Sequence, residues 1–300
     1  MKGEMSKMDE KSKIVEGAKQ YSKYITTNIP QLSENGNVIY YFSGSLAMLL
    51  LNEAISIKSM FLDEDGQVVR ERLEFDISEE NRKSFARGIR PLSLDVDTVA
   101  TRPNVFNRRT NIITTTVEVI KNCPLATKLC PMWGIRGTSN YFDCLESEEE
   151  GRIFKGHDIA EITIKDGTKV IIADPLCMLV HKLADAMMCK DCIDRLSLGL
   201  SPETLQTKYE KDINDFASMF NGIISHYDGF DFLQVINHIY ETYDSTFSSL
   251  IKQDSLDILK QFYLDVKESI DEDKQERLFQ FIDAVSKKNQ EKIDERKRLV

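Results

Sequence analysis

The spacing of apolar residues along the chain predicts a mixed first half and a helical second half. Up to residue 198, apolar positions recur at helical spacing in some stretches and alternate or form short β-branched runs in others. This half is predicted to contain helices over 11–29, 46–54, 79–87 and 174–196, and strands over 38–42, 59–62, 67–73, 92–99, 111–120, 140–145, 161–164 and 169–173. For 111–120 a helix is the alternative. Beyond Gly199 every apolar pattern is helical, over 202–220, 231–243, 247–270 and 273–300.

This order of elements predicts an α+β fold in two domains. Turn signals at Asp65-Gly66 and Asp166-Gly167 join neighbouring strands as hairpins. We expect a mixed sheet flanked by helices in domain 1–198, followed by a helical-bundle domain at 199–300.

Composition fits a globular protein of this size. The chain has 300 residues, 41% of them hydrophobic and 29% charged, which is enough for two domains. No apolar run approaches the roughly 18 residues of a membrane span, and the first thirteen residues are polar. The sequence therefore predicts a cytoplasmic protein without a membrane partner.

Charge is distributed unevenly along the chain. The net charge of −10 argues against a general nucleic-acid binder. Residues 81–136 nevertheless contain ten basic and three acidic residues, whereas residues 201–300 contain 13 basic and 20 acidic ones. The basic block suits an anionic substrate, or alternatively a basic face that docks on an acidic partner.

Two aspartates lie inside this basic block. Asp95 and Asp97 are separated by one residue in an apolar run, so on a strand both belong to the same face. Two adjacent carboxylates repel unless a cation neutralises them, and Mg²⁺ or Mn²⁺ bound together with substrate phosphates is the usual one. The same spacing also fits two solvated aspartates at a sheet edge.

Two further features suit phosphate binding. The predicted strand 38–42 runs into Ser43-Gly44-Ser45 and then a helix, an arrangement in which backbone N–H groups can approach an anion. Lys182 lies off the apolar stripe of the helix 174–196, where it is either a cation for phosphates or a solvated surface lysine.

The six cysteines suggest reduced thiols, because they are scattered and no export signal accompanies them. Cys189 and Cys192 form a C-x-x-C, and together with Cys177 and His181 they have the residue types of a zinc site. On one helix, however, the two pairs would lie about 18 Å apart, which is too far to share an ion.

Four segments together resemble the motifs of the nucleotidyltransferase superfamily, in the same order. They read FSGSLAMLL, LSLDVDTV, NYFDCL and VIIADPLCMLVHKLADAM. The AbiEii-like branch, which supplies toxins of abortive-infection and type IV toxin–antitoxin systems, is the most similar. The resemblance implies a nucleotidyltransferase-like domain followed by a helical one.

The resemblance also implies roles for single residues. Asp95, Asp97 and Asp143 match the catalytic and metal-binding carboxylates, and Ser93 precedes the first of them as it does in the family. The implied nucleotide-binding residues are Gly44, Ser45, Ser93, Lys182, Asp212 and Asp215.

Some of these assignments have rivals in the sequence. Asp158 competes with Asp143 for the third carboxylate, and Lys190-Asp191 with Asp194 competes with Lys211-Asp212 and Asp215 for a later K-D-x-x-D motif. Gly44 and Asp95 are 51 positions apart, so the hairpin about Asp65 resembles an insertion.

The implied activity is a Mg²⁺-dependent transfer of a nucleotidyl group from an NTP to a hydroxyl. The acceptor would be a tRNA 3′ end or a protein, Asp143 would take the hydroxyl proton, and a cognate antitoxin would be a partner. A non-catalytic interaction module of the same fold and a small-molecule, antibiotic-type nucleotidyltransferase are the alternatives.

Overall fold

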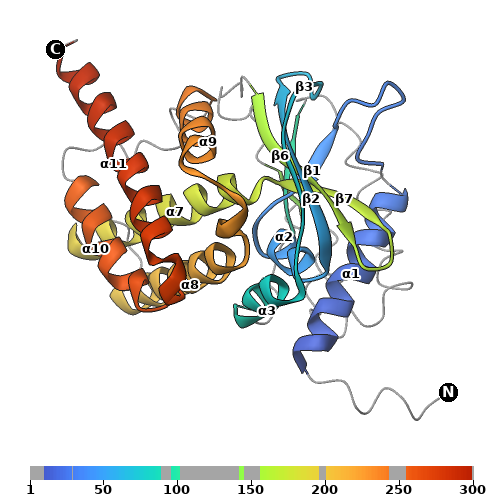
Figure 1. Cartoon of the computed structure of the whole chain (residues 1–300), viewed down its shortest axis with the longest axis horizontal. Coiled ribbons are helices and arrows are strands. Elements are labelled where there is room, and N and C mark those ends of the chain that lie inside the picture. The colour runs from blue at the N-terminus through green and yellow to red at the C-terminus, as the bar shows by residue number, and fades with distance from the viewer. Residues whose placement is uncertain are drawn as a thin grey trace. The chain divides into compact units, whose positions relative to one another are not determined.

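The computed structural model describes residues 10–28, 30–88, 96–101, 142–144, 156–195, 201–242 and 255–298. The chain forms two compact units, Met1–Asp174 and Pro175–Val300. The first unit is α+β and the second is helical, as Figure 1 shows. Helix α7 (Pro175–Arg195) packs against α8 (Pro202–Ile223) and belongs to the second unit, whereas the predicted domain boundary follows residue 198.

The first unit is built on a mixed sheet. Its strands are β1 (Tyr40–Phe42), β2 (Ala54–Asp63), β3 (Val68–Asp76), β4 (Val96–Ala100), β5 (Phe142–Cys144), β6 (Gly156–Ile164) and β7 (Lys169–Ala173). Their order in the sheet is β3-β2-β6-β7-β1-β4-β5. The pairs β1–β7 and β4–β5 are parallel and the others are antiparallel. The α+β class and the mixed sheet are therefore confirmed; the strand predicted at 111–120 lies outside the described residues.

Both predicted hairpins are present; β2, β3 and β6 are longer than predicted, and β7 has the predicted bounds. The β2–β3 turn is closed by Asp63, whose carboxylate accepts hydrogen bonds from the backbone N–H groups of Asp65 and Gln67. Gly66 and Gly167 each adopt a positive φ, of 74° and 82°, in the two turns. Such a φ favours glycine because it has no Cβ to clash with the backbone.

Three helices flank the sheet. They are α1 (Glu10–Asn28), α2 (Gly44–Leu51) and α3 (Glu79–Arg87). Helix α2 is almost entirely apolar and contacts β4, β6 and both other helices. Ser78 caps α3 by accepting a hydrogen bond from Asn81 N–H, and Gly88 ends the helix where the sequence predicts.

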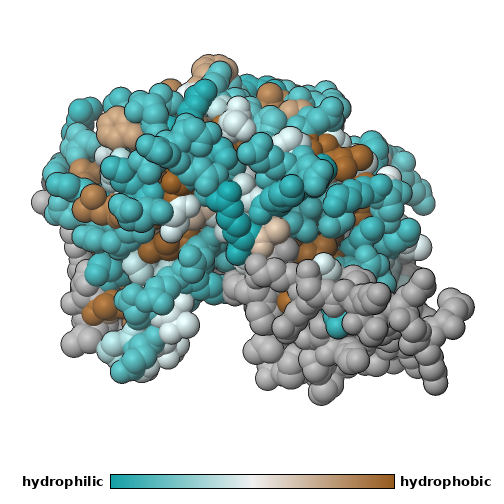
Figure 2. All heavy atoms as spheres, turned by 60° about the horizontal axis from the view of Figure 1, so that its bottom comes forward, coloured by the Kyte–Doolittle hydropathy of each residue, from teal (hydrophilic) through white to brown (hydrophobic). Residues whose placement is uncertain are grey.

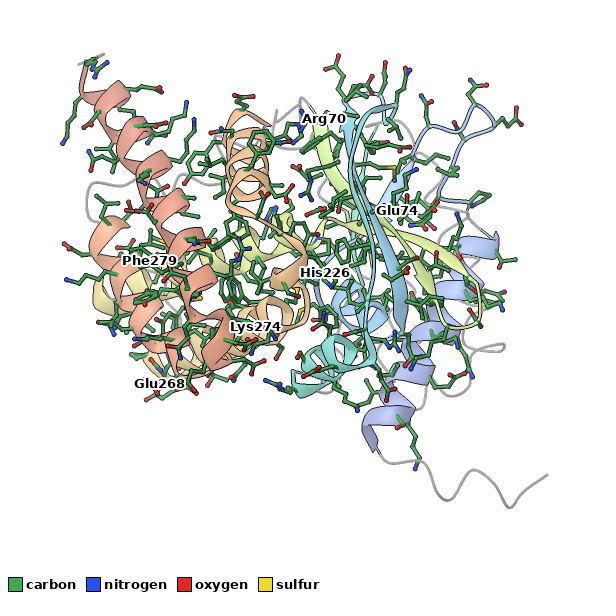
Figure 3. All side chains as sticks on the ribbon, in the orientation of Figure 1. Arg70, Glu74, His226, Glu268, Lys274 and Phe279 are labelled. Carbon is green, nitrogen blue, oxygen red and sulfur yellow. The ribbon has the colours of Figure 1, made fainter. Side chains whose placement is uncertain are left out.

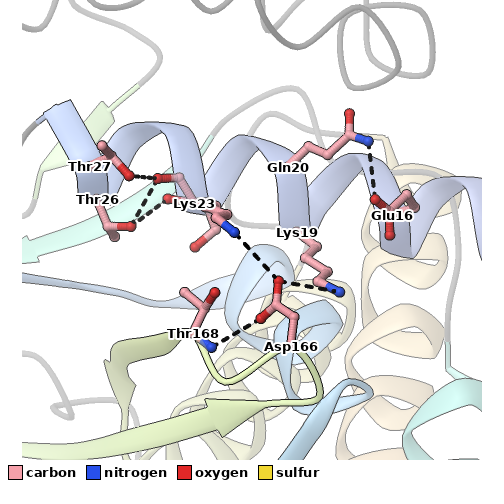
Figure 4. Close-up of polar contacts among 9 residues, drawn as sticks. Glu16, Lys19, Gln20, Lys23, Thr26, Thr27, Asp166 and Thr168 are labelled. Atoms are coloured by element: carbon pink, nitrogen blue, oxygen red, sulfur yellow. Dashed lines mark hydrogen bonds and ion pairs between the residues drawn. The ribbon is translucent and has the colours of Figure 1, made fainter.

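Helix α1 is fixed at its polar side by one carboxylate. Its apolar residues are buried, and Lys19 and Lys23 both reach Asp166 in the β6–β7 turn, at 3.6 and 3.8 Å (Figure 4). Asp166 also accepts a hydrogen bond from Thr168 N–H. Partial burial raises the pKa of Asp166, but hydrogen bonds with Thr168 and the charges of the two lysines outweigh this effect, so the pKa is lowered.

The second unit is helical, as predicted. After α7 and α8 it contains α9 (Gly229–Thr242), α10 (Ser255–Lys267) and α11 (Gln275–Arg298), with short 3-10 turns at Ile224–His226 and Glu272–Lys274. Rings from α8 to α11 pack together in its core. Phe216 contacts Phe220, Phe262 and Phe281, and Phe232 contacts Phe281.

The coloured part of the face in Figure 2 is mainly hydrophilic. On the face in Figure 2, apolar side chains appear as small separate patches. Among the exposed side chains labelled in Figure 3, Phe279 on α11 is apolar, and Arg70 and Glu74 on β3 are charged. Among the helices that the structure describes, none combines the length and the apolar character needed to cross a bilayer.

Candidate functional site

The turn that follows β1 starts the candidate site. Strand β1 ends at Phe42, and α2 begins at Gly44 with a positive φ of 57°. Ser43 stands at the N-cap of α2, but its side chain makes no capping hydrogen bond. The N–H groups at the start of a helix lack partners within the helix and favour anions. The predicted order of strand, Gly-Ser turn and helix is present; phosphate binding at Gly44 and Ser45 stays a prediction.

Strand β4 brings the predicted carboxylate strand directly beside this turn. It pairs antiparallel with β1, and Phe42 is opposite Thr98. Continuing that register by one residue places position 97 opposite Ser43. Directly opposite residues of an antiparallel pair have Cα atoms roughly 4.5 to 5.5 Å apart. The register therefore places Asp97 next to the turn; Asp95 and Ser93 lie outside the described residues.

Strand β5 adds the third predicted carboxylate position. It pairs parallel with β4, and Asp97 is the register partner of Asp143. Neighbouring strands are about 4.8 Å apart, and residues in register occupy the same face of a sheet. The backbone thus places two aspartate positions side by side, although they are distant in the sequence.

Asp158 lies at a different place in the sheet. It is on β6, opposite Phe61, and it is buried with 1% of its surface exposed. Between β4 and β6 lie β1 and β7, so three strand spacings, or about 14 Å, separate Asp158 from Asp97. The structure therefore brings Asp143 next to Asp97 and keeps Asp158 away from both.

A buried ion pair that sequence reasoning missed lies at the end of β7. Arg72 of β3 donates to Asp174 over 2.6 Å, and the two side chains are only 3% and 1% exposed. The Arg72 and Arg70 guanidinium groups both lie over the Phe61 ring. No local signal identifies this pair because its members are 102 residues apart and because Asp174 precedes a proline, as helix-capping residues often do.

A second missed contact joins Tyr41 to His157. The Tyr41 hydroxyl and His157 Nδ1 form a hydrogen bond of 3.0 Å, and the rings meet edge to face. Both residues are buried, at 3% and 1% exposure. In the sequence Tyr41 belongs to an apolar run and His157 to a stretch that reads as a charged loop, so neither suggests the other.

In the second unit, Lys182 of α7 meets the two predicted aspartates of α8. Its ammonium lies 2.9 Å from Asp212 and 3.4 Å from Asp215, and both carboxylates are 1% exposed. The structure thus brings Lys182, Asp212 and Asp215 together. The Lys182 side chain is only 14% exposed, so the alternative of a solvated surface lysine is wrong.

Burial and charge act against each other in this cluster. Burial alone would lower the pKa of Lys182, but Asp212 and Asp215 outweigh it and the pKa is raised. Burial raises the pKa of Asp212 in spite of the lysine. Burial lowers the pKa of the adjacent His181 to about 4, and the charge of Lys182 adds to this effect.

The cysteines do not form a zinc site in the described part of the chain. Cys177, Cys189 and Cys192 are buried free thiols. Burial raises the pKa of Cys189 to about 11, which disfavours the thiolate that zinc needs. Among the described residues, no group of three or more His, Cys, Asp or Glu side chains is placed to hold a metal ion.

The carboxylate positions on β4 and β5 fit a divalent cation by the chemistry of their donors. Mg²⁺ and Mn²⁺ prefer carboxylate oxygens, and Mg²⁺ is usually held by one or two carboxylates plus substrate phosphates. The backbone register places the positions of Asp97 and Asp143 next to each other beside the turn after β1, and both residue types are suited to such a cation.

Comparisons with known proteins add no relative. No protein-family model matches the chain, and no curated protein or solved structure shows a significant match to it.

Proposed function

We propose that this protein is a metal-dependent nucleotidyltransferase whose metal is held by Asp95, Asp97 and Asp143. One observation carries the proposal: Asp97 and Asp143 are register partners on parallel strands, directly beside the turn at Ser43 and Gly44. A carboxylate pair next to a helix N-terminus combines a place for a cation with a place for phosphate. The order of sequence motifs supports the same activity.

The chain's own groups have separate tasks in this proposal. The backbone N–H groups of Gly44 and Ser45 bind phosphate oxygens of the NTP and orient the nucleotide. The acceptor hydroxyl oxygen attacks the α-phosphorus, the bond to the bridging oxygen of the β-phosphate breaks, and pyrophosphate leaves. Asp143 accepts the proton of the attacking hydroxyl. A bound Mg²⁺ would supply Lewis-acid stabilisation of the charge that develops on the phosphate oxygens.

The proposal for Lys182 differs from that for the acids. Its ammonium can contribute positive charge to a triphosphate while it lies 2.9 Å from Asp212 and 3.4 Å from Asp215. We therefore propose that Lys182 contributes the positive charge in nucleotide binding and that Asp212 and Asp215 hold its ammonium in place. Acceptors would be an RNA 3′ end or a protein hydroxyl, and an antitoxin would be the regulatory partner.

The decisive experiment measures transfer and binding together. The protein is incubated with each of four α-³²P-labelled NTPs, Mg²⁺ or Mn²⁺, and total cellular RNA or protein. We expect label to enter one acceptor class only when a divalent cation is present. Calorimetry should show that NTP binding also requires the cation.

Matched variants assign the activity to the carboxylates. Asp97→Asn keeps the side-chain shape but removes a metal-binding charge, so cation-dependent binding and transfer should both be lost. The control is Asp76→Asn, which should behave as wild type. Asp76 is an exposed residue of β3, the strand at the opposite edge of the same sheet. Unchanged binding and transfer in Asp97→Asn would refute the proposed function.

A further inference from the structure

Strand β1 connects the candidate site to the rest of the sheet. In the described part of the chain, β5 pairs with β4, and β4 joins the other strands through β1. The turn with Gly44 follows β1 directly. A displacement of β1 would therefore move the turn and both aspartate strands relative to the other four strands.

Backbone pairing joins β1 to its other neighbour, β7, over only a short stretch. The pairing of β1 with β7 has one register pair, Phe42 with Ile172. At the preceding residue of β7, Ile171, the backbone N–H and C=O groups both bond to the side-chain amide of Gln31, at 2.8 Å each. That amide also donates a long bond of 3.4 Å to Tyr40 O. A side chain thus takes the place of a strand partner where β1 and β7 separate.

The hydrogen bond between Tyr41 and His157 spans this weak junction. Tyr41 lies on β1 and His157 on β6, and β7 lies between these two strands. Tyr41 is the register partner of Val99, and Val99 and Asp97 are two residues apart on β4. Because successive residues alternate between faces, Tyr41, Val99 and Asp97 share one face of the sheet. The bond therefore fixes β1 on the face that carries the aspartate positions.

The bond between Tyr41 and His157 matters mainly because it fixes the relative position of the two side chains. A buried neutral hydrogen bond contributes a modest net stability, and replacing both partners by apolar groups of similar shape can be nearly neutral. Two apolar side chains would pack with less directional preference, whereas a 3.0 Å bond between a hydroxyl and a ring nitrogen sets one distance. Geometry, more than stability, is what the pair supplies.

We infer that Tyr41 and His157 are positioning residues that fix β1, and thereby the carboxylate strands, for metal binding. This inference rests on the proposed function, since it assumes a metal at Asp97 and Asp143. Neither residue needs to touch the metal or the nucleotide. Their effect is to keep the turn and the carboxylate positions in one arrangement before the metal binds.

The test compares Tyr41→Phe with wild type in two measurements. Tyr41→Phe keeps the buried ring and removes only the hydroxyl. Hydrogen–deuterium exchange of peptides covering β1 should become faster. The Mn²⁺ affinity, measured by electron paramagnetic resonance of free Mn²⁺ well below the unfolding temperature, should fall about 10-fold, the lower end of the range for outer-shell partners.

Tyr40→Phe is the matched control. Tyr40 is the neighbouring residue of the same strand, is equally buried, and belongs to the opposite face of the sheet. Its variant should bind Mn²⁺ as wild type does. In a double-mutant cycle, adding His157→Leu to Tyr41→Phe should lower the Mn²⁺ affinity no further, because both changes break the same bond.

The outcomes separate the two ideas. Wild-type protein that fails to bind Mn²⁺ would overturn the proposed function, and the inference with it. Wild-type binding that is unchanged in Tyr41→Phe would overturn the inference alone. Faster exchange in β1 with unchanged Mn²⁺ affinity would also overturn it, because the bond would then serve stability without positioning the site.

Discussion

The ammonium of Lys182 on α7 lies 2.9 Å from a carboxylate oxygen of Asp212 on α8, almost enclosed by the two helices. Asp215 lies 3.4 Å from the same ammonium, so one cation serves two buried carboxylates. Buried like charges repel each other strongly and are poorly hydrated. The lysine therefore compensates charges that the helix pair could not otherwise contain.

We expect Lys182→Met to destabilise the protein. The methionine fills most of the lysine stem's volume but leaves Asp212 and Asp215 without their common cation. Breaking a buried ion pair by removing one partner costs about 3 to 5 kcal/mol. Urea unfolding followed by circular dichroism should show this loss as a lower midpoint.

Two controls distinguish burial from simple loss of charge. Lys169→Met breaks an exposed pair with Glu161 and should leave the midpoint nearly unchanged. Adding Asp212→Asn and Asp215→Asn to Lys182→Met removes the excess negative charge and should recover much of the stability. If Lys182→Met unfolds at the wild-type urea concentration, the buried network is not a stabilising element.

Lys182 also shows where sequence reasoning fails. The apolar pattern places Lys182 off the stripe of a helix predicted over 174–196, and the structure has this helix at Pro175–Arg195. A position off the stripe is usually solvated, and only a neighbouring helix can bury it. That helix is α8, and Asp212 is 30 residues further along the chain. A pattern read along one helix contains no information about such a partner.

The third carboxylate can be assigned by a pair of isosteric variants. We expect Asp143→Asn to weaken Mn²⁺ binding by at least about 10-fold, since its position is in register with Asp97. Asp158→Asn should bind Mn²⁺ as wild type does, because about 14 Å separates its strand from β4. Calorimetric titration with Mn²⁺ measures both, and the reverse result would make Asp158 the metal ligand.

Local signals predicted most elements of the fold, and distant pairing determined the rest. The bounds of α3 match the prediction because Ser78 and Gly88 mark its two ends within the sequence itself. Strand β6 was predicted to begin at Glu161 but begins at Gly156, because residues 156–160 form strand by pairing with β2. The insertion of β1 between β7 and β4 likewise depends on contacts that no single segment reveals.

Gly66 is expected to be the least replaceable of the turn glycines with a described environment. A Cβ at this position would lie 2.1 Å from Val38 O and 2.8 Å from the Thr101 hydroxyl, and φ is positive. Gly66 O also accepts a hydrogen bond from Val38 N–H, so the turn is held against this segment. Gly66→Ala therefore combines backbone strain with a clash against the main chain.

Gly167→Ala provides the comparison for Gly66→Ala. Gly167 has a similar φ of 82°, but nothing lies within 4 Å of its added Cβ. The strain alone costs roughly 1 to 2 kcal/mol, and this is the loss that we expect for Gly167→Ala. Gly66→Ala should lose clearly more in thermal or urea unfolding. Equal losses would mean that the Val38 segment moves away without penalty.

His181 should make the stability of the protein depend on pH. Burial lowers its pKa from the ordinary value of 6.5 to about 4 in the folded chain, and Lys182 adds to the effect. Between these two pH values the unfolded chain binds a proton that the folded chain does not. The part of the unfolding free energy that depends on neutral His181 is fully present above pH 6.5, and it is lost as the pH falls toward 4. Over this interval the loss is on the order of 3 kcal/mol.

The variant His181→Gln cannot take up this proton, so its unfolding free energy should fall less than that of wild type between pH 6.5 and pH 4.5. Asp212 opposes the trend, because its raised pKa lets the folded chain bind a proton more readily than the unfolded one as the pH falls. It is present in both proteins, so the difference between the two urea-unfolding profiles isolates the histidine. Parallel profiles over this range would show that His181 titrates alike in the folded and unfolded chains.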